Sequence, residues 1–232
     1  MMLSKGEING IKYVYREGFS DQKTILEVIG KDVYRKKGNK ILSGERWMDC
    51  GGNIGAFALL ACSAGAKVTV YEPDPYNCEM IKRNLELNKF EATVKQVALV
   101  HDDQKEAILF IGNNNNVWRN SIVKRWNNKG LKVPCLNFDE ESKSFDCCKM
   151  DIEGAEMNIL ENTNKVFDKL VYEWSFDIDP SLKRFWSLIE KQQRAYKRVA
   201  DIGNTARFKT RDYDVWQKSW FPACTNVFCF NK

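Results

Sequence analysis

The sequence predicts an α/β domain in which helices cover both faces of a mostly parallel β-sheet. From Ile41 onward, short apolar runs alternate with amphipathic segments of helical period, which is typical of repeated βα units. A glycine-rich turn at residues 49–55 follows the first apolar run, and the acidic Glu72 ends the second. In such sheets the carboxyl ends of the strands form the ligand-binding edge, so we expect both features there.

The expected elements follow one another without a repeat or a linker. Residues 6–39 form a lead-in with a helix at residues 22–29 and a hairpin. Strands are expected at residues 46–49, 67–72, 93–100, 106–111, 145–151, 170–174, 196–202 and 225–230, and helices at residues 53–63, 75–88, 154–162 and 180–194. We therefore expect a single domain over residues 1–232, with a lead-in of residues 1–40 and a Rossmann-like core of residues 41–232.

Composition excludes several classes of protein. Of 232 residues, 44% are hydrophobic and 29% charged, which is ordinary for a soluble globular domain. No apolar run is long enough to span a membrane, and the polar N-terminus lacks the apolar run of a signal peptide, so we expect a cytoplasmic protein. The eight cysteines lack paired zinc-site spacing and are expected to be free thiols. The net charge of +5 is mild and spread along the chain, which favours a solvated surface over a nucleic-acid footprint.

The glycine-rich turn indicates a cofactor that is cationic at its reactive end. A dinucleotide site needs a second glycine where this chain has Asn53, whose side chain would lie against a pyrophosphate. Asp49 would repel a pyrophosphate but attract the ammonium of a methionyl tail. Glu72 lies about 20 residues beyond the turn, where an acidic group accepts the hydrogens of both ribose hydroxyls.

Three motifs together resemble the FkbM family of methyltransferases: residues 49–55, Tyr71-Glu72-Pro73, and Lys149-Met150-Asp151-Ile152-Glu153-Gly154-Ala155-Glu156. The octet is the most specific of the three, and the resemblance extends over Ile41 to Phe230, including Val97-Ala98-Leu99. It implies a Rossmann-like class I methyltransferase fold, with a seven-stranded sheet whose last strand is antiparallel. It also implies O-methylation of a hydroxyl on a sugar, a glycan or a related small molecule, with S-adenosyl-L-methionine as cofactor. The expected cofactor-binding residues are Asp49, Gly51, Asn53, Gly55, Glu72 and Ala98. Gly52 stands where similar sequences often have alanine, a difference that we expect to be harmless.

A sugar hydroxyl needs a base that takes its proton, and acidic residues gather where the fourth and fifth core strands end. We expect Asp151 to act as general base or as anchor for the acceptor hydroxyl, or else to cap the following helix. Glu153 either orients the acceptor or complements the helix dipole. Glu173 lies at the end of the next strand, and Lys149 shares a face with Asp151 and is expected to pair with it. The expected catalytic residues are Asp151, Glu153, Glu173 and Lys149.

Other interpretations remain open at this stage. Asp151, Glu153, Glu173 and Asp177 could hold a divalent cation, although no ligand set is fixed and we expect none. His101 or Asp102 could contact the adenine. The long loop at residues 112–130 is a candidate acceptor site, and an aromatic platform for a sugar is suggested by Trp118, Trp126 and Trp174.

Two other functions also remain open. One is RNA or DNA methylation, which the acidic octet disfavours because it would repel phosphates. The other is a non-catalytic protein that binds S-adenosylmethionine. We expect a small-molecule acceptor, no nucleic acid and no membrane span.

Overall fold

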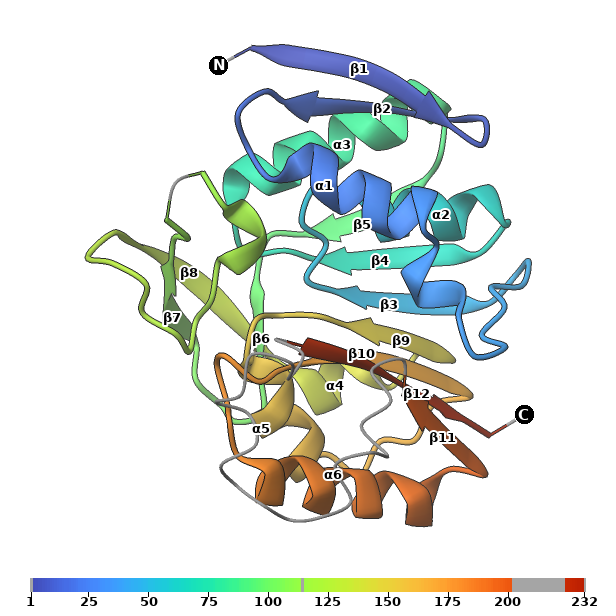
Figure 1. The fold of residues 1–232 in the computed structure, drawn as a ribbon, viewed down its shortest axis with the longest axis vertical. Coiled ribbons are helices and arrows are strands. Elements are labelled where there is room, and N and C mark those ends of the chain that lie inside the picture. The colour runs from blue at the N-terminus through green and yellow to red at the C-terminus, as the bar shows by residue number, and fades with distance from the viewer. Residues whose placement is uncertain (1, 114, 202–223, 232) are drawn as a thin grey trace.

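The computed structural model describes residues 2–113, 115–201 and 224–231, and its centre is a twisted seven-stranded sheet (Figure 1). The strand order is β11-β12-β10-β9-β3-β4-β5. Strand β12 runs antiparallel to both β10 and β11, whereas the pairs from β10 to β5 are parallel. The predicted seven-stranded sheet with an antiparallel last strand is confirmed. Its strands are β3 (Arg46–Cys50), β4 (Lys67–Tyr71), β5 (Ala92–Lys95), β9 (Cys147–Met150), β10 (Lys169–Ser175), β11 (Arg198–Asp201) and β12 (Cys224–Phe230).

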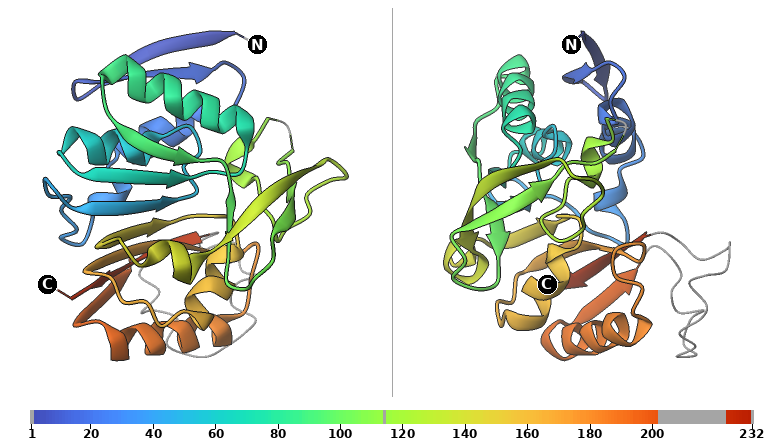
Figure 2. Two further views of the ribbon diagram at one scale, coloured as in Figure 1. Left: turned by 180° about the vertical axis from the view of Figure 1, so that it is seen from behind. Right: turned by 90° about the vertical axis from the view of Figure 1, so that its left-hand side faces the viewer.

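Helices cover both faces of this sheet (Figures 1 and 2). Its strands are apolar along their length, and successive side chains point to opposite faces, so both faces need to be covered. On β3, Trp47 packs into the cluster formed with the first three helices, and the next residue, Met48, packs into the cluster on the opposite face. Both side chains are completely buried. The helices are α1 (Asp21–Ile25), α2 (Ala56–Ser63) and α3 (Pro75–Asn88) on one face, and α4 (Phe138–Ser142), α5 (Ala155–Asn162) and α6 (Leu182–Ala195) on the other.

The N-terminal lead-in is a hairpin followed by a helix, as expected. Strands β1 (Leu3–Ile8) and β2 (Ile11–Arg16) pair antiparallel, and α1 continues into a π-helical turn, Leu26–Gly30. The buried Asn84 of α3 accepts a hydrogen bond from the backbone N–H of Val14 (2.7 Å) and donates one to its carbonyl (3.2 Å). The lead-in is thereby fixed against α3, beside which it lies in Figure 2.

The prediction of a single strand at residues 93–100 is wrong. The backbone N–H of Val97 bonds to the carbonyl of Lys95, and this turn separates β5 from β6 (Ala98–Val100). Strand β6 leaves the main sheet and joins a second one of order β6-β8-β7, with β7 at Glu106–Phe110 and β8 at Gly130–Asn137. The short helix α4, capped by the side chain of Asn137, was not expected. Ala98 therefore belongs to the second sheet and not to the main one.

The remaining expected elements lie close to their predicted positions. Helix α3 matches its prediction, and α2, α5 and α6 begin one to three residues later than expected. The end of the strand expected at residues 196–202 reaches residue 202, which lies outside the described residues. All eight cysteines are free. Within the described ranges, no helix is both long enough and apolar enough to cross a membrane.

Candidate active site

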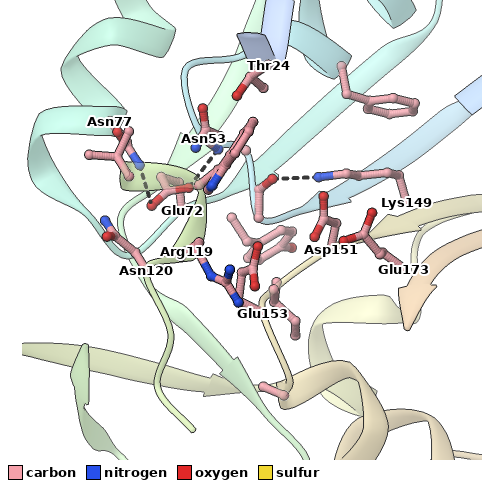
Figure 3. A pocket seen from close by; sticks show the side chains of 18 of the residues that line it. Thr24, Asn53, Glu72, Asn77, Arg119, Asn120, Lys149, Asp151, Glu153 and Glu173 are labelled. Atoms are coloured by element: carbon pink, nitrogen blue, oxygen red, sulfur yellow. Dashed lines mark hydrogen bonds between the residues drawn. The ribbon is translucent and has the colours of Figure 1, made fainter. Parts of the chain in front are cut away.

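A cavity of about 300 Å³ lies at the carboxyl ends of β3, β4, β9 and β10 (Figure 3). Eight of the ten residues that the sequence singled out line it. They are Gly51, Asn53, Glu72, Ala98, Lys149, Asp151, Glu153 and Glu173. The other two, Asp49 and Gly55, do not line it but belong to the same turn.

The glycine-rich turn is held in place by close backbone packing. Gly51 has a φ of +82°, and a Cβ at this position would lie 1.8 Å from the carbonyl oxygen of Asp151. A Cβ on Gly52 would lie 2.2 Å from Cγ1 of the buried Val70. Glycine therefore fits this turn, whereas an alanine in its place would clash with Val70, whose β-branched side chain has little freedom to turn away. Gly55, with a φ of +91°, caps α2 and packs against Ile81.

The carboxylate of Glu72 ties the second strand to the turn. Its Oε2 accepts a hydrogen bond from the backbone N–H of Asn53 (2.7 Å), and its Oε1 accepts one from that of Asp74 (2.9 Å). Burial raises the pKa of Glu72 to about 7. The buried Oδ1 of Asn53 has no hydrogen-bond partner in the part of the chain that the structure describes. The wall of the cavity therefore offers a tethered carboxyl group and an unsatisfied acceptor side by side.

Lys149 pairs with Asp49 rather than with Asp151. Its Nζ lies 3.2 Å from Asp49 Oδ1 and donates hydrogen bonds to the carbonyl oxygens of Gly51 (2.6 Å) and Cys50 (3.3 Å). Burial alone would lower the pKa of Lys149, but the charges of Asp49 and Asp151 hold it above its ordinary value. The lysine is thus a satisfied buried cation that supports the glycine-rich turn. The expected pairing with Asp151 does not occur.

Three carboxylates converge at the other side of the cavity. Oxygens of Asp151, Glu153 and Glu173 all lie within 4.8 Å of one another. Burial, and then the charge of Asp151, raise the pKa of both Glu153 and Glu173 well above the ordinary range. Hard divalent cations bind such oxygens, so three of the four residues named for the metal alternative are within reach of one ion. The fourth, Asp177, instead pairs with Arg119.

The acidic residues around the N-terminus of α5 have different roles. Gly154 is the N-cap, so the alternative of Asp151 as helix cap is wrong. Both carboxylate oxygens of Glu156 accept from the backbone N–H of Gly154 (2.9 and 3.1 Å), which makes this residue structural. Glu153 has a left-handed φ of +54° and lines the cavity.

Tyr34, a cavity residue that the sequence did not single out, comes from the lead-in. Its hydroxyl donates a 2.8 Å hydrogen bond to Asp151 Oδ2, across 117 positions of sequence. Burial and the charge of Asp151 raise the pKa of Tyr34 well above 10, so it stays a donor. In the sequence, Tyr34 begins a short basic stretch that looks like solvated surface, and no local pattern signals its role.

The loop at residues 112–130 also contributes to the cavity, through Trp118, Arg119, Asn120 and Ile122. Asn120 donates a 2.8 Å hydrogen bond to Asp74 Oδ2, which connects this loop to the first turn of α3.

Three residues that the sequence suggested for contact with the sugar or the adenine do not line the cavity. Trp174 is completely buried against Phe176 and Phe185, so it cannot serve as a platform. His101 and Asp102 are exposed and lie outside the cavity lining.

Comparison with known proteins supports one class of enzyme. The family model of the methyltransferase FkbM domain matches residues 49–199. A S-adenosylmethionine-dependent methyltransferase from Agrobacterium tumefaciens superposes with a TM-score of 0.51 at 13% identity, covering 99% of this chain and 70% of that one.

Two further solved structures are longer than this chain. The tRNA (uracil-54, C5)-methyltransferase of Pyrococcus abyssi, in complex with S-adenosyl-L-homocysteine, has a TM-score of 0.49 at 12% identity, covering 98% of this chain and 43% of its own. The T. thermophilus 16S rRNA N2 G1207 methyltransferase gives 0.48 at 14%, covering 100% and 50%. The chain thus spans half or less of the length of these two enzymes, and likeness at such identities concerns the fold alone. A search of curated protein sequences returned no match.

Proposed function

This chain belongs to the FkbM family of S-adenosylmethionine-dependent methyltransferases, and we propose that its acceptor is a hydroxyl of a sugar, a glycan or a related small molecule. The observation that carries the proposal is the convergence of Asp151, Glu153 and Glu173 within 4.8 Å in the cavity that Gly51 and Glu72 also line. Carboxylates bind neighbouring hydroxyls by accepting their hydrogens, and one of them can also take the proton of the reacting hydroxyl.

The cofactor-side wall of the cavity fits S-adenosylmethionine. Glu72 and the unsatisfied Asn53 Oδ1 offer acceptors for the ribose hydroxyls, and the backbone of Gly51 and Gly52 is open to the cavity. Ala98, with neighbouring apolar side chains, offers a surface for the adenine. When bound, the cofactor supplies an electrophilic methyl group on a positively charged sulfur. Asp49 is fully buried and paired with Lys149, so in this scheme it holds the turn and does not contact the cofactor.

We assign Asp151 the role of general base. Tyr34 donates to one of its carboxylate oxygens, which fixes the side chain and leaves the second oxygen for the acceptor hydroxyl. The raised pKa values of Glu153 and Glu173 mean that protons are shared within the cluster. These two residues would bind the other hydroxyls of the acceptor, and Asp151 would take the proton of the reacting hydroxyl. Lys149 is a positioning residue in this scheme, because its contacts hold the turn and not the acceptor.

The test measures S-adenosylhomocysteine formed from S-adenosylmethionine with a panel of free sugars, glycosides and sugar phosphates. We expect turnover with at least one sugar, and a fall of about 10²–10⁴-fold in Asp151→Asn, the usual loss when a general base is removed. Asp103→Asn, a matched change of an exposed aspartate outside the cavity, should retain full activity.

Three other outcomes would redirect the proposal. Turnover that is restricted to oligonucleotides would replace the sugar acceptor by nucleic acid. Binding of S-adenosylhomocysteine without turnover on any acceptor would favour the non-catalytic alternative. Activity that EDTA abolishes and Mg²⁺ restores would make the three carboxylates cation ligands rather than direct proton acceptors.

A further inference from the structure

A second cavity, of about 430 Å³, adjoins the first. Trp118 and Arg119 line both cavities, so the two share a wall. The second cavity lies between the loop at residues 112–130 and the turn that precedes α1. Hydrogen bonds join these segments: the hydroxyl of Ser20 accepts from the backbone N–H of Trp118 (3.3 Å), and Asn115 donates to the carbonyl of Gly18 (3.4 Å). It is therefore a defined part of the fold, built by the lead-in and the acceptor-side loop together.

The two cavities differ in charge. The first is lined by six carboxylates and two cations, so carboxylates predominate there: Glu27, Glu72, Asp151, Glu153, Glu173 and Asp177 against Lys149 and Arg119. The second is lined by no carboxylate among the described residues but by two cations, Lys23 and Arg119. Lys23 forms no ion pair with any described residue, so its charge is available to a ligand. An anionic group would thus be repelled from the first cavity and attracted to the second.

Aromatic and amide groups complete the second cavity. The guanidinium of Arg119 lies 4.2 Å from the ring centre of Trp126, and Lys23 Nζ lies 5.8 Å from that of Trp118. Two donors on this wall, Arg119 Nε and Trp126 Nε1, and one acceptor, Asn116 Oδ1, have no hydrogen-bond partner within the described ranges. Indole faces pack against the C–H faces of sugar rings, and unsatisfied donors suit oxygen-rich ligands.

We propose that the second cavity binds the anionic group of the acceptor, and that the acceptor is therefore a sugar carrying a phosphate or a carboxylate. This inference deepens the proposed function and rests on it. The reacting hydroxyl lies among Asp151, Glu153 and Glu173, while the negative group lies beyond Trp118, near Lys23 and the free donor of Arg119. The opposite charges of the two cavities fix the direction of the acceptor, because the reverse orientation would place the anion among carboxylates.

Calorimetric titration of the full chain tests this proposal. The probes are glucose 1-phosphate and glucuronic acid, with methyl glucoside as the uncharged control, each with and without S-adenosylhomocysteine. We expect at least one anionic sugar to bind more tightly than methyl glucoside, with an affinity that falls as salt rises. Comparison of the phosphate with the carboxylate identifies the preferred group.

Charge variants assign the binding to the second cavity. Lys23→Glu should weaken binding of the anionic sugar by about tenfold or more, since it places like charges together. Lys23→Arg keeps the positive charge and should therefore retain the wild-type affinity for the anionic sugar. Lys82→Glu, the same change at an exposed lysine of α3 outside both cavities, should leave the affinity within about twofold. Unchanged binding of S-adenosylhomocysteine shows that each variant is folded.

Several results would overturn the inference. These are binding of methyl glucoside as tight as that of the anionic sugars, an affinity that Lys23→Glu leaves unchanged, and no binding of either anionic sugar. Tighter Lys23-dependent binding of a 5′-phosphorylated oligonucleotide would replace the sugar by nucleic acid. A different result would contradict the proposed function alone. If an anionic sugar binds in a Lys23-dependent way but is never methylated, the second cavity is an anion-binding site and the proposed methylation of a sugar hydroxyl is wrong.

Discussion

Asp49 and Lys149 are direct partners in the parallel register of β3 and β9, and their charged groups lie 3.2 Å apart inside the sheet. Both side chains are almost completely buried, with exposed fractions of 0% and 4%. The lysine also donates to the carbonyl oxygens of Cys50 and Gly51. One ion pair thus connects β3 and β9 to the turn between β3 and α2.

Replacement of Lys149 by methionine should destabilise the protein strongly. The change leaves Asp49 buried without its cation, which typically costs about 3–5 kcal/mol. The free energy of unfolding from urea denaturation measures the effect. Lys82→Met, at an exposed position, should change it by less than about 0.5 kcal/mol. The double variant Asp49→Asn/Lys149→Met should lose less than Lys149→Met alone. A larger loss in the double variant would mean that the pair is not the source of the effect.

Cofactor affinity should depend on pH through Glu72. Burial raises the pKa of Glu72 to about 7, and only the ionised carboxylate accepts the hydrogens of both ribose hydroxyls. At pH 6 roughly one tenth of these groups would be ionised, so S-adenosylhomocysteine should bind about tenfold more weakly at pH 6 than at pH 8. Calorimetric titration across this range measures the change. Glu72→Gln should bind more weakly at all pH values without this slope, and a wild-type affinity that is flat from pH 6 to 8 contradicts the assignment.

The same group should affect stability in the absence of ligand. Its pKa is higher in the folded protein, about 7, than the ordinary value of 4.5, so the folded state binds more protons between these limits. The free energy of unfolding therefore falls as pH rises through this window, and Glu72 contributes at most about 3 kcal/mol of the fall. Denaturation at pH 5 and pH 8 should show a smaller decrease for Glu72→Gln than for the wild type. An equal decrease in both proteins would show that Glu72 does not titrate in this range.

Alanine at Gly52 should destabilise the turn. Its Cβ would lie 2.2 Å from Val70 Cγ1 and 3.0 Å from Ile81 Cδ1, and overpacking of this kind typically costs about 1–3 kcal/mol. Gly30→Ala is a matched control, because the nearest atom to its added Cβ lies 3.9 Å away. Thermal unfolding compares the two. The additional change Val70→Ala should restore part of the lost stability, and failure to do so would place the strain elsewhere.

Loss of the Tyr34 hydroxyl should reduce catalysis and spare the cofactor. Tyr34→Phe removes the 2.8 Å hydrogen bond to Asp151, so the carboxylate is no longer fixed toward the acceptor. We expect kcat to fall by about tenfold, which corresponds to about 1.4 kcal/mol and is typical of a hydrogen bond to a charged group. The affinity for S-adenosylhomocysteine should stay unchanged. Tyr76→Phe, at an exposed tyrosine, serves as control. An equal loss of cofactor affinity would show that Tyr34 supports the whole cavity.

The sequence predicted the sheet well because its signals are local. Apolar runs and a helix begun by Asp74 and Pro75 are visible within a few residues, and the octet at residues 149–156 marks the end of β9. The split between β5 and β6 was missed because residues 93–100 contain no glycine or proline at the turn near Val97.

The site was predicted only where it depends on strand ends. Asp151 follows β9 and Glu173 lies near the end of the adjacent strand β10, so their proximity could be inferred from the fold. The partner of Lys149 could not, because Asp49 and Asp151 both lie near it and the choice between them depends on register. The roles of Tyr34 and Lys23 could not be predicted for a related reason. They lie more than a hundred positions from the residues of the octet, and only tertiary packing brings Tyr34 to Asp151.

Part of the wall of the proposed acceptor site comes from outside the segment that matches the family. Lys23 and Tyr34 precede residue 49, while Cys224 and Asn226 follow residue 199. The cofactor turn and the carboxylates Asp151 and Glu173, by contrast, lie within it. Changes in these flanking segments would therefore alter the proposed acceptor site while leaving the cofactor turn and the carboxylates of the octet in place.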